Sequence, residues 1–224
     1  MNASGNVRNG IGMTSDRTRR RMIDRLRDGG ISDEVVLRAM SKVPRHLFVE
    51  EALASRAYDD VSLPIGSGQT ISRPYTVART CELARNGTSL KRVLEIGTGC
   101  GYQAAVLAEL SQEVYSIERI GALLSGARVR LKSLNCHNVR VKHADGSVGL
   151  ESLFPIDAIV VAAGAIEFPK HLMELLTQDG RLIIPLGEGK QYLTEVTKSE
   201  SGYDLKKHDE VSFVPFLSGV VVKR

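Results

Sequence analysis

Residues 92–103 are RVLEIGTGCGYQ, and this stretch decides the fold. The run RVLEI has the length and apolar character of a buried strand, and a helical pattern begins at Tyr102. Between them, Gly97, Gly99 and Gly101 carry no Cβ, so a ligand can approach the backbone closely. In an open α/β sheet, ligands bind at the carboxyl ends of the strands. The stretch therefore predicts a ligand site at the end of one strand of such a sheet.

The spacing of the glycines argues against a dinucleotide. A dinucleotide fold prefers G-x-G-x-x-G, and that pattern would need a glycine where this chain has Tyr102. The observed G-x-G-x-G favours a ligand that lies against the turn without a pyrophosphate on the helix N-terminus. Because a glycine-rich turn occurs in many α/β folds, other residues must specify the ligand.

From residue 91, apolar runs of strand length alternate with helical patterns. The runs VVAA and LIIP are continuously apolar, as expected for strands buried on both faces. This alternation predicts an α/β fold with a mainly parallel central sheet and helices on both sides. The final third has strand patterns without helices between them, so the sheet should finish antiparallel. The expected strands are 92–96, 114–117, 139–142, 158–162, 181–186, 192–197, 203–213 and 217–222, and the expected helices are 102–110, 122–134 and 169–176.

Helices are also predicted before this core. The first should begin at Ser15 or Asp16 and end at Gly29, and the second should take Ser32 as its N-cap. A third short helix is expected over 50–57, a loop over 63–73, and a further helix from Pro74 to about Ala84. The expected organisation is a flexible tail (1–16) and a single domain (17–224), divided into the N-terminal helices with the loop (17–85) and the α/β core (86–224).

The composition excludes several classes of protein. The chain has 224 residues, of which 42% are hydrophobic, enough for one domain with a core. No stretch approaches the roughly 20 apolar residues of a membrane span, and the first ten residues lack the apolar segment of a signal peptide. The three cysteines are far apart and the histidines lack ligand spacing, so we expect reduced thiols and no metal. The expectation is a cytoplasmic monomer without membrane attachment.

Basic residues are concentrated between residues 17 and 27, and the net charge is +4. Clustered arginines can bind phosphates, but they more often form the solvated face of a helix. Tryptophan is absent and 5% of residues are aromatic, so stacking platforms for bases are missing. We therefore expect no nucleic-acid partner.

Two acidic residues follow the next strands of the expected sheet. Glu118 ends the run VYSIE and could accept hydrogen bonds from both hydroxyls of a ribose. Asp145 and Gly146 end the run VKHADG, where the carboxylate could accept from an adenine amino group, although Asp-Gly is also a common turn. A glycine turn and two acids at successive strand ends together predict an adenosine-containing ligand.

Five segments resemble the isoaspartyl methyltransferase family. Residues 94–103 (LEIGTGCGYQ) are similar to its first methyltransferase motif, and residues 63–74 (LPIGSGQTISRP) are similar to an active-site segment that general methyltransferases lack. The other similar segments are 43–48 (VPRHLF), 179–187 (DGRLIIPLG) and 213–216 (FVPF). The resemblance covers residues 17–217 and implies a Rossmann-like S-adenosylmethionine-dependent methyltransferase fold.

The resemblance also implies a reaction and a site. The cofactor would be S-adenosylmethionine, and the substrate a protein or peptide whose L-isoaspartyl residue is methylated on its free α-carboxylate, which initiates repair. Ser72 would be the catalytic residue, although a serine just before Pro74 could also cap the following helix. The implied cofactor-binding residues are Gln69, Thr70, Ile71, Gly97, Thr98, Gly99, Gly101, Glu118, Asp145 and Gly146.

The chemistry suits these residue types. A carboxylate with a pKa near about 4 is already an anion at neutral pH, so no general base is required. A serine hydroxyl can orient it by donating a hydrogen bond to one oxygen while the other oxygen attacks. Two positions depart from the family pattern: Cys100 replaces a serine in the glycine turn, and residues 162–168 (AAGAIEF) differ after the fourth strand.

Three alternatives stay open. The first is a methyltransferase for another carboxylate or protein acceptor. The second is a nicotinamide-dependent oxidoreductase, against which Tyr102 argues. The third is a binding module without activity, which the presence of Ser72, Glu118 and Asp145 disfavours.

Overall fold

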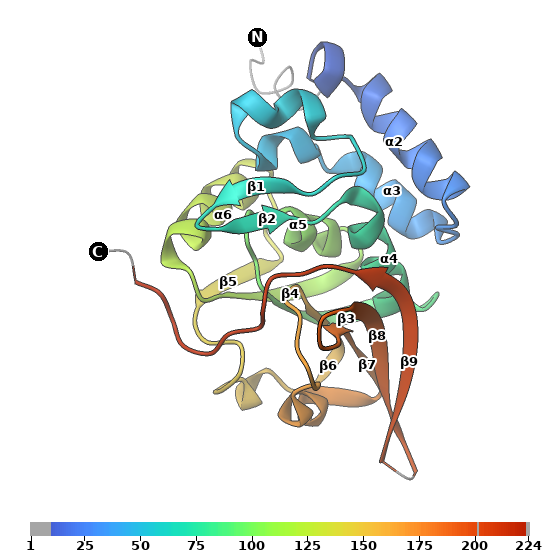
Figure 1. Cartoon of the computed structure of the whole chain (residues 1–224), viewed down its shortest axis with the longest axis vertical. Helices are drawn as coiled ribbons and strands as arrows, with labels where there is room; N and C mark the ends of the chain where they lie inside the picture. The colour runs from blue at the N-terminus through green and yellow to red at the C-terminus, as the bar shows by residue number, and fades with distance from the viewer. Residues whose placement is uncertain (1–9, 201, 223–224) are drawn as a thin grey trace.

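A seven-stranded sheet forms the centre of the computed structural model, which describes residues 10–200 and 202–222 (Figure 1). The strand order is β5-β4-β3-β6-β7-β8-β9. The first five of these strands are parallel, and β8 and β9 continue the sheet antiparallel. The sheet strands are β3 (Leu90–Ile96), β4 (Ser111–Glu118), β5 (Val139–His143), β6 (Ile156–Val161), β7 (Leu176–Leu186), β8 (Gln191–Ser199) and β9 (Gly202–Val211).

Alternate residues of the central strands supply two separate hydrophobic cores. Val93 of β3 packs in one core and Leu94 in the other, because successive side chains of a strand point to opposite faces. The first core includes residues from every α-helix, whereas the second is closed by 3-10 helices and loops. The α-helices are α2 (Asp16–Asp28), α3 (Glu34–Lys42), α4 (Pro74–Arg85), α5 (Tyr102–Ala108) and α6 (Gly121–Ser133).

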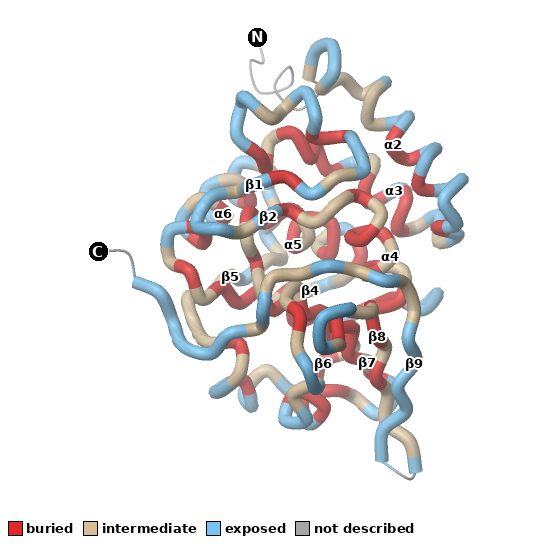
Figure 2. Tube along the Cα trace, in the orientation of Figure 1, coloured by how far each residue is buried: buried red, intermediate tan, exposed pale blue. Residues whose placement is uncertain are grey.

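Short 3-10 helices fill most of the remaining connections. The segment 169–176, expected as an α-helix, is instead a 3-10 helix, so the second face of the sheet carries no α-helix within the described chain. Burial is highest in the middle strands and lowest along β9 and the chain that follows it (Figure 2). The 3-10 helices are η1 (Gly12–Thr14), η2 (Arg45–Phe48), η3 (Glu51–Arg56), η4 (Glu151–Leu153) and η5 (Lys170–Leu175).

The N-terminal helices lie close to their expected positions. Helix α2 begins after Ser15, whose side chain accepts from the Thr18 amide, and α4 begins at Pro74. The N-cap of α3 is Asp33, which accepts from two backbone amides, so the prediction of Ser32 is wrong by one residue. The predicted flexible tail falls largely on residues 1–9, which lie outside the described residues.

The segment 63–73 is a β-hairpin, which corrects the expectation of a loop. Strand β1 (Leu63–Gly66) pairs antiparallel with β2 (Gln69–Ile71). Ser67 and Gly68 connect the strands with φ of 52° and 67°, as a two-residue hairpin turn requires. Strands this short show too little alternation for recognition, although the Ser-Gly pair between them is a turn signal.

The segment 217–222 is not a strand, contrary to expectation. Its only ladder contact in the described chain is an isolated bridge between Val221 and Ile120. The Arg119 guanidinium donates to the Gly219 carbonyl at 2.9 Å, so this exposed segment runs across the end of β4. A helix with the length and hydropathy of a membrane span is absent from the described residues.

Candidate functional site

A cavity of about 1160 Å³, including its open mouth, lies at the carboxyl ends of β3, β4 and β6. Its walls come from the glycine turn after β3, the end of β4, the β1–β2 hairpin, and residues 212–217 after β9. The lining includes nine of the eleven site residues expected from the sequence: Gln69, Thr70, Ile71, Ser72, Gly97, Thr98, Gly99, Glu118 and Gly146.

The three glycines of the turn have different surroundings. All have positive φ, at 100°, 54° and 92°, which side-chain-bearing residues rarely adopt. A Cβ added at Gly99 would lie 3.2 Å from Ile65 of β1, so the hairpin closes directly over the turn. Gly101 lies outside the cavity lining, and a Cβ there would meet Ala127 of α6 at 3.3 Å. Gly97 and Gly99 thus border the cavity, whereas Gly101 allows α5 and α6 to pack.

Glu118 is buried at the end of β4 and holds the turn in place. Its Oε2 accepts from the Gly99 amide at 2.7 Å, and its Oε1 accepts from the Ile120 amide at 2.8 Å. Each carboxylate oxygen can accept a second hydrogen bond, so these contacts leave capacity for ribose hydroxyls. The residue combines a structural role in the turn with an acceptor that faces the cavity.

Beneath the turn lies a second carboxyl group, Glu95, which is fully buried. It accepts from the Ser116 hydroxyl at 2.5 Å and from the Gln103 amide at 3.2 Å, and Ser116 also contacts the Thr98 hydroxyl at 2.6 Å. Burial raises the pKa of Glu95 to about 8, and the nearby Glu118 carboxylate adds to the rise. Glu95 is therefore mainly protonated at neutral pH.

Asp145 and Gly146 have different roles. Gly146 lines the cavity, and a Cβ there would lie 2.3 Å from Ile96, so only glycine fits. Asp145 lies outside the lining, and its oxygens accept from Ser147 and from the Gly219 amide. The carboxylate thus anchors the C-terminal segment beside the place where the sequence predicts adenine.

Ser72 lies directly after β2 and borders the same cavity. It is partly buried and lines the cavity together with the three residues of β2. The N-cap position of α4 is Arg73, and no side chain caps this helix. The alternative role of Ser72 as a helix cap is therefore wrong, and the residue borders the cavity.

The sequence did not predict the wall formed by residues 212–217, although the FVPF motif lies in it. Gln191 of β8 makes two hydrogen bonds to the backbone of Phe213, and the Gly164 backbone bonds to Val214 and Phe216. Gly164 belongs to the segment that departs from the family pattern, so that segment supports the wall. The apolar FVPF motif was the available signal, but its pairing partners are remote in sequence.

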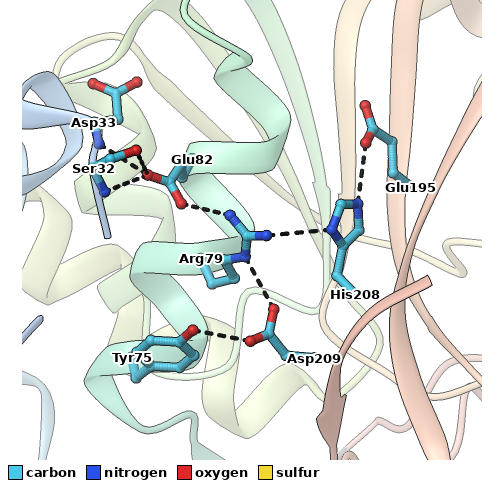
Figure 3. Close-up of polar contacts among 8 residues, drawn as sticks. All are labelled: Ser32, Asp33, Tyr75, Arg79, Glu82, Glu195, His208 and Asp209. Carbon is cyan, nitrogen blue, oxygen red and sulfur yellow. Dashed lines mark hydrogen bonds and ion pairs between the residues drawn. The ribbon is translucent and has the colours of Figure 1, made fainter. Parts of the chain in front are cut away.

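A polar network joins α4 to β9 (Figure 3). Arg79 donates to one oxygen of Asp209 at 3.0 Å, and the Tyr75 hydroxyl donates to the other at 2.9 Å. Partial burial alone would raise the pKa of Asp209, but these two hydrogen bonds lower it below its usual range. The network extends through Glu82 to Ser32 and Asp33, and through His208 to Glu195. Because α4 follows Ser72 and β9 leads into residues 212–217, the network connects the supports of two cavity walls.

Comparison with known proteins agrees with this geometry. A family model described as protein-L-isoaspartate(D-aspartate) O-methyltransferase matches residues 17–221. The protein-L-isoaspartate O-methyltransferase of Dechloromonas aromatica is 56% identical over 94% of this chain and 98% of its own length. That of Chromobacterium violaceum is 53% identical over 93% of this chain and 94% of its own.

A solved structure shares the fold. The Plasmodium falciparum protein-L-isoaspartate O-methyltransferase, crystallised with S-adenosyl-L-homocysteine, superposes with a TM-score of 0.75 at 28% identity, covering 89% of this chain and 98% of that one. The family match over most of the chain, the two bacterial relatives and this structure agree. The chain belongs to the protein-L-isoaspartate (D-aspartate) O-methyltransferase family.

Proposed function

We propose that this protein transfers the methyl group of S-adenosylmethionine to the free α-carboxylate of L-isoaspartyl residues in damaged proteins and peptides, the first step of their repair. One observation carries the proposal: the glycine turn, Glu118 and residues 69–72 line a single cavity. The glycine turn and Glu118 suit an adenosine-containing cofactor, and residues 69–72 form the segment whose sequence resembles the family's active site.

The residues of the strand ends fit the cofactor. Gly97 and Gly99 leave the backbone open to a ligand, and Glu118 offers acceptor oxygens to ribose hydroxyls. Gly146 lets the third strand end approach the cavity, and Asp145 lies beside it as a candidate for the adenine amino group. When bound, the cofactor would supply an electrophilic methyl group on a sulfonium sulfur.

The chain itself needs to orient the acceptor and exclude water. The isoaspartyl carboxylate is ionised at neutral pH, so proton removal is not part of the reaction. The Ser72 hydroxyl can donate to one carboxylate oxygen and direct the other toward the methyl group. Such positioning can supply several kcal/mol of the barrier. Gln69, Thr70 and Ile71, which line the cavity beside Ser72, would close this end from solvent.

The family relation supports proteins and peptides as acceptors, whereas a cytoplasmic monomer that binds no nucleic acid stays a prediction from the sequence. The test of the acceptor is a pair of peptides that differ only in one residue, L-isoaspartyl in one and L-aspartyl in the other. We expect methyl transfer to the first peptide and at most trace transfer to the second. Equal methylation of both, or of neither while a small carboxylic acid is methylated, would contradict the proposed acceptor.

A further inference from the structure

Arg45 is a fully buried arginine whose contacts reach Ser72. It lies in η2, and none of its surface is exposed. Its Nε donates to the Ala57 carbonyl at 2.8 Å, and its Nη2 donates to the Ser72 carbonyl at 2.7 Å. One rigid guanidinium therefore fixes the backbone of Ser72 to the end of η3.

The same guanidinium also contacts the glycine turn. Its Cζ lies 4.7 Å from the centroid of the Tyr102 ring, within the range of a cation–π interaction. Tyr102 follows Gly101, begins α5 and lines the cavity, and Phe48 packs edge-on against the same ring at 5.5 Å. Arg45 thus contacts both the segment that carries Ser72 and the residue next to the turn.

The burial of the Arg45 cation carries an energetic cost. No carboxylate forms an ion pair with Arg45 in the described part of the chain, and burial lowers its pKa. Burying an unpaired charge is unfavourable, and apolar side chains often stabilise a core better. The planar guanidinium group of arginine, however, can donate to two carbonyls and stack on a ring at the same time, which neither lysine nor an apolar residue can do.

We propose that Arg45 is a positioning residue for methyl transfer: it holds Ser72 at a fixed distance from the glycine turn, so that acceptor and methyl donor meet in line. This inference rests on the proposed function, because it requires Ser72 to orient the acceptor. Arg45 lies outside the cavity lining and acts through the Ser72 backbone and the Tyr102 ring.

The test is a double-mutant cycle on methylation of the isoaspartyl peptide, with Arg45→Lys, Ser72→Ala and the double variant. Lysine keeps the charge but cannot bond both carbonyls and stack on the ring. We expect Arg45→Lys to lower kcat by about 10–100-fold, since displacement by about 1 Å can cost that much. Affinity for S-adenosylhomocysteine should stay within about twofold. In the Ser72→Ala background, the same change should lower kcat by no more than about threefold, because the group that it positions is absent.

A matched control is Arg85→Lys. Arg85 is also a buried arginine, but it pairs with Asp33 at 2.7 Å and lies outside the cavity lining. We expect this variant to lower the melting temperature and to leave kcat near the wild-type value. If Arg45→Lys does not fold, Arg45→Gln takes its place in the cycle, since it removes the buried charge and keeps a donor.

The outcomes separate the two claims. Effects of Arg45→Lys and Ser72→Ala on kcat that multiply in the double variant would overturn the positioning role. So would an Arg45→Lys variant that loses only thermal stability, as the control does. Wild-type protein that does not methylate the isoaspartyl peptide would instead overturn the proposed function on which the inference rests.

Discussion

Two parts of the cavity lining are built in different ways. The part proposed to bind the cofactor, the cofactor end, consists of consecutive strand ends of one parallel sheet, which carry Gly97, Gly99 and Glu118. The part proposed to bind the acceptor, the acceptor end, combines a two-stranded hairpin with residues 212–217, which are more than 100 positions away in the chain. Sheet topology alone brings the first set together, whereas the second needs specific cross-links.

Those cross-links are polar and partly buried. Arg45 fastens the Ser72 carbonyl to η3, and the Arg79–Asp209 pair fastens α4 to β9. At the cofactor end, the corresponding contact joins two adjacent strands: Glu118, at the end of β4, accepts from the amide of Gly99, which follows β3. The difference suggests that substitutions at the cofactor end should change binding, and those at the acceptor end should change turnover.

The largest effect is expected for Gly99→Val. A branched side chain at φ of 54° is strained, and it would point at Ile65 in the space next to the turn. We expect affinity for S-adenosylhomocysteine to fall by roughly 100-fold or more, a loss of about 3 kcal/mol that calorimetry can measure. Gly101→Ala is the control: it should lower stability through contact with Ala127 but leave affinity largely intact. Equal loss of affinity in both variants would break the distinction between the two glycines.

Glu118→Ala should produce the next largest effect. Removal of an acceptor for ribose hydroxyls, in a position that also holds the Gly99 amide, should raise the Kd of S-adenosylhomocysteine about tenfold or more. One charge-assisted hydrogen bond contributes roughly 1.5–3 kcal/mol. Glu118→Gln should lose less, because the amide oxygen can still accept from one backbone amide. An unchanged Kd in calorimetry would contradict the assignment of Glu118 to the cofactor.

Glu95→Gln tests the buried carboxyl group beneath the turn. The pKa of Glu95 is about 8 in the folded protein, well above its unfolded value, so the folded state binds more protons between about pH 4.5 and 8. The free energy of unfolding should therefore fall as pH rises through this window. The variant should lack this dependence and be more stable than wild type by about 2 kcal/mol near pH 6, with the difference growing toward pH 8. Urea denaturation from pH 5 to 8.5 checks this. If the free energies of unfolding of wild type and variant change with pH in parallel, Glu95 is ionised in the folded protein.

The smallest effect is expected for Asp209→Asn in the network of Figure 3. The hydrogen bonds from Arg79 and Tyr75 lower the pKa of Asp209, so its stabilisation is present above about pH 4 and is lost as pH falls through the lower folded value. We expect a loss of about 1 kcal/mol at neutral pH, because the pair is partly exposed to solvent. The difference from wild type in urea denaturation should shrink below pH 4. A constant difference across pH would exclude the charge as its source.

The sequence predicted the cofactor end better than the acceptor end for a physical reason. Continuous apolar runs identify parallel strands, and parallel strands end on one edge, so the sequence pattern alone predicts that the glycine turn, Glu118 and Gly146 are neighbours. The hairpin of residues 63–71 was not predicted because strands of four and three residues show little alternation. Arg45 lies in the 43–48 segment that resembles the family, but the sequence indicated no role for it, since a buried arginine and a solvated one look alike in sequence. Gly101 and Asp145 have the right spacing, yet they lie outside the cavity lining.

The most direct test of whether Ser72 orients the acceptor and Glu118 binds the cofactor is to measure kcat and cofactor Kd on the same preparations of Ser72→Ala and Glu118→Ala. We expect Ser72→Ala to lower kcat for the isoaspartyl peptide by about 10–100-fold, the value of one hydrogen bond to an anion, with Kd for S-adenosylhomocysteine within about twofold of wild type. Glu118→Ala should raise that Kd by about tenfold or more. Wild-type kcat in Ser72→Ala, or a rise in Kd as large as the fall in kcat, would contradict the assignment of acceptor orientation to Ser72 and of cofactor binding to Glu118.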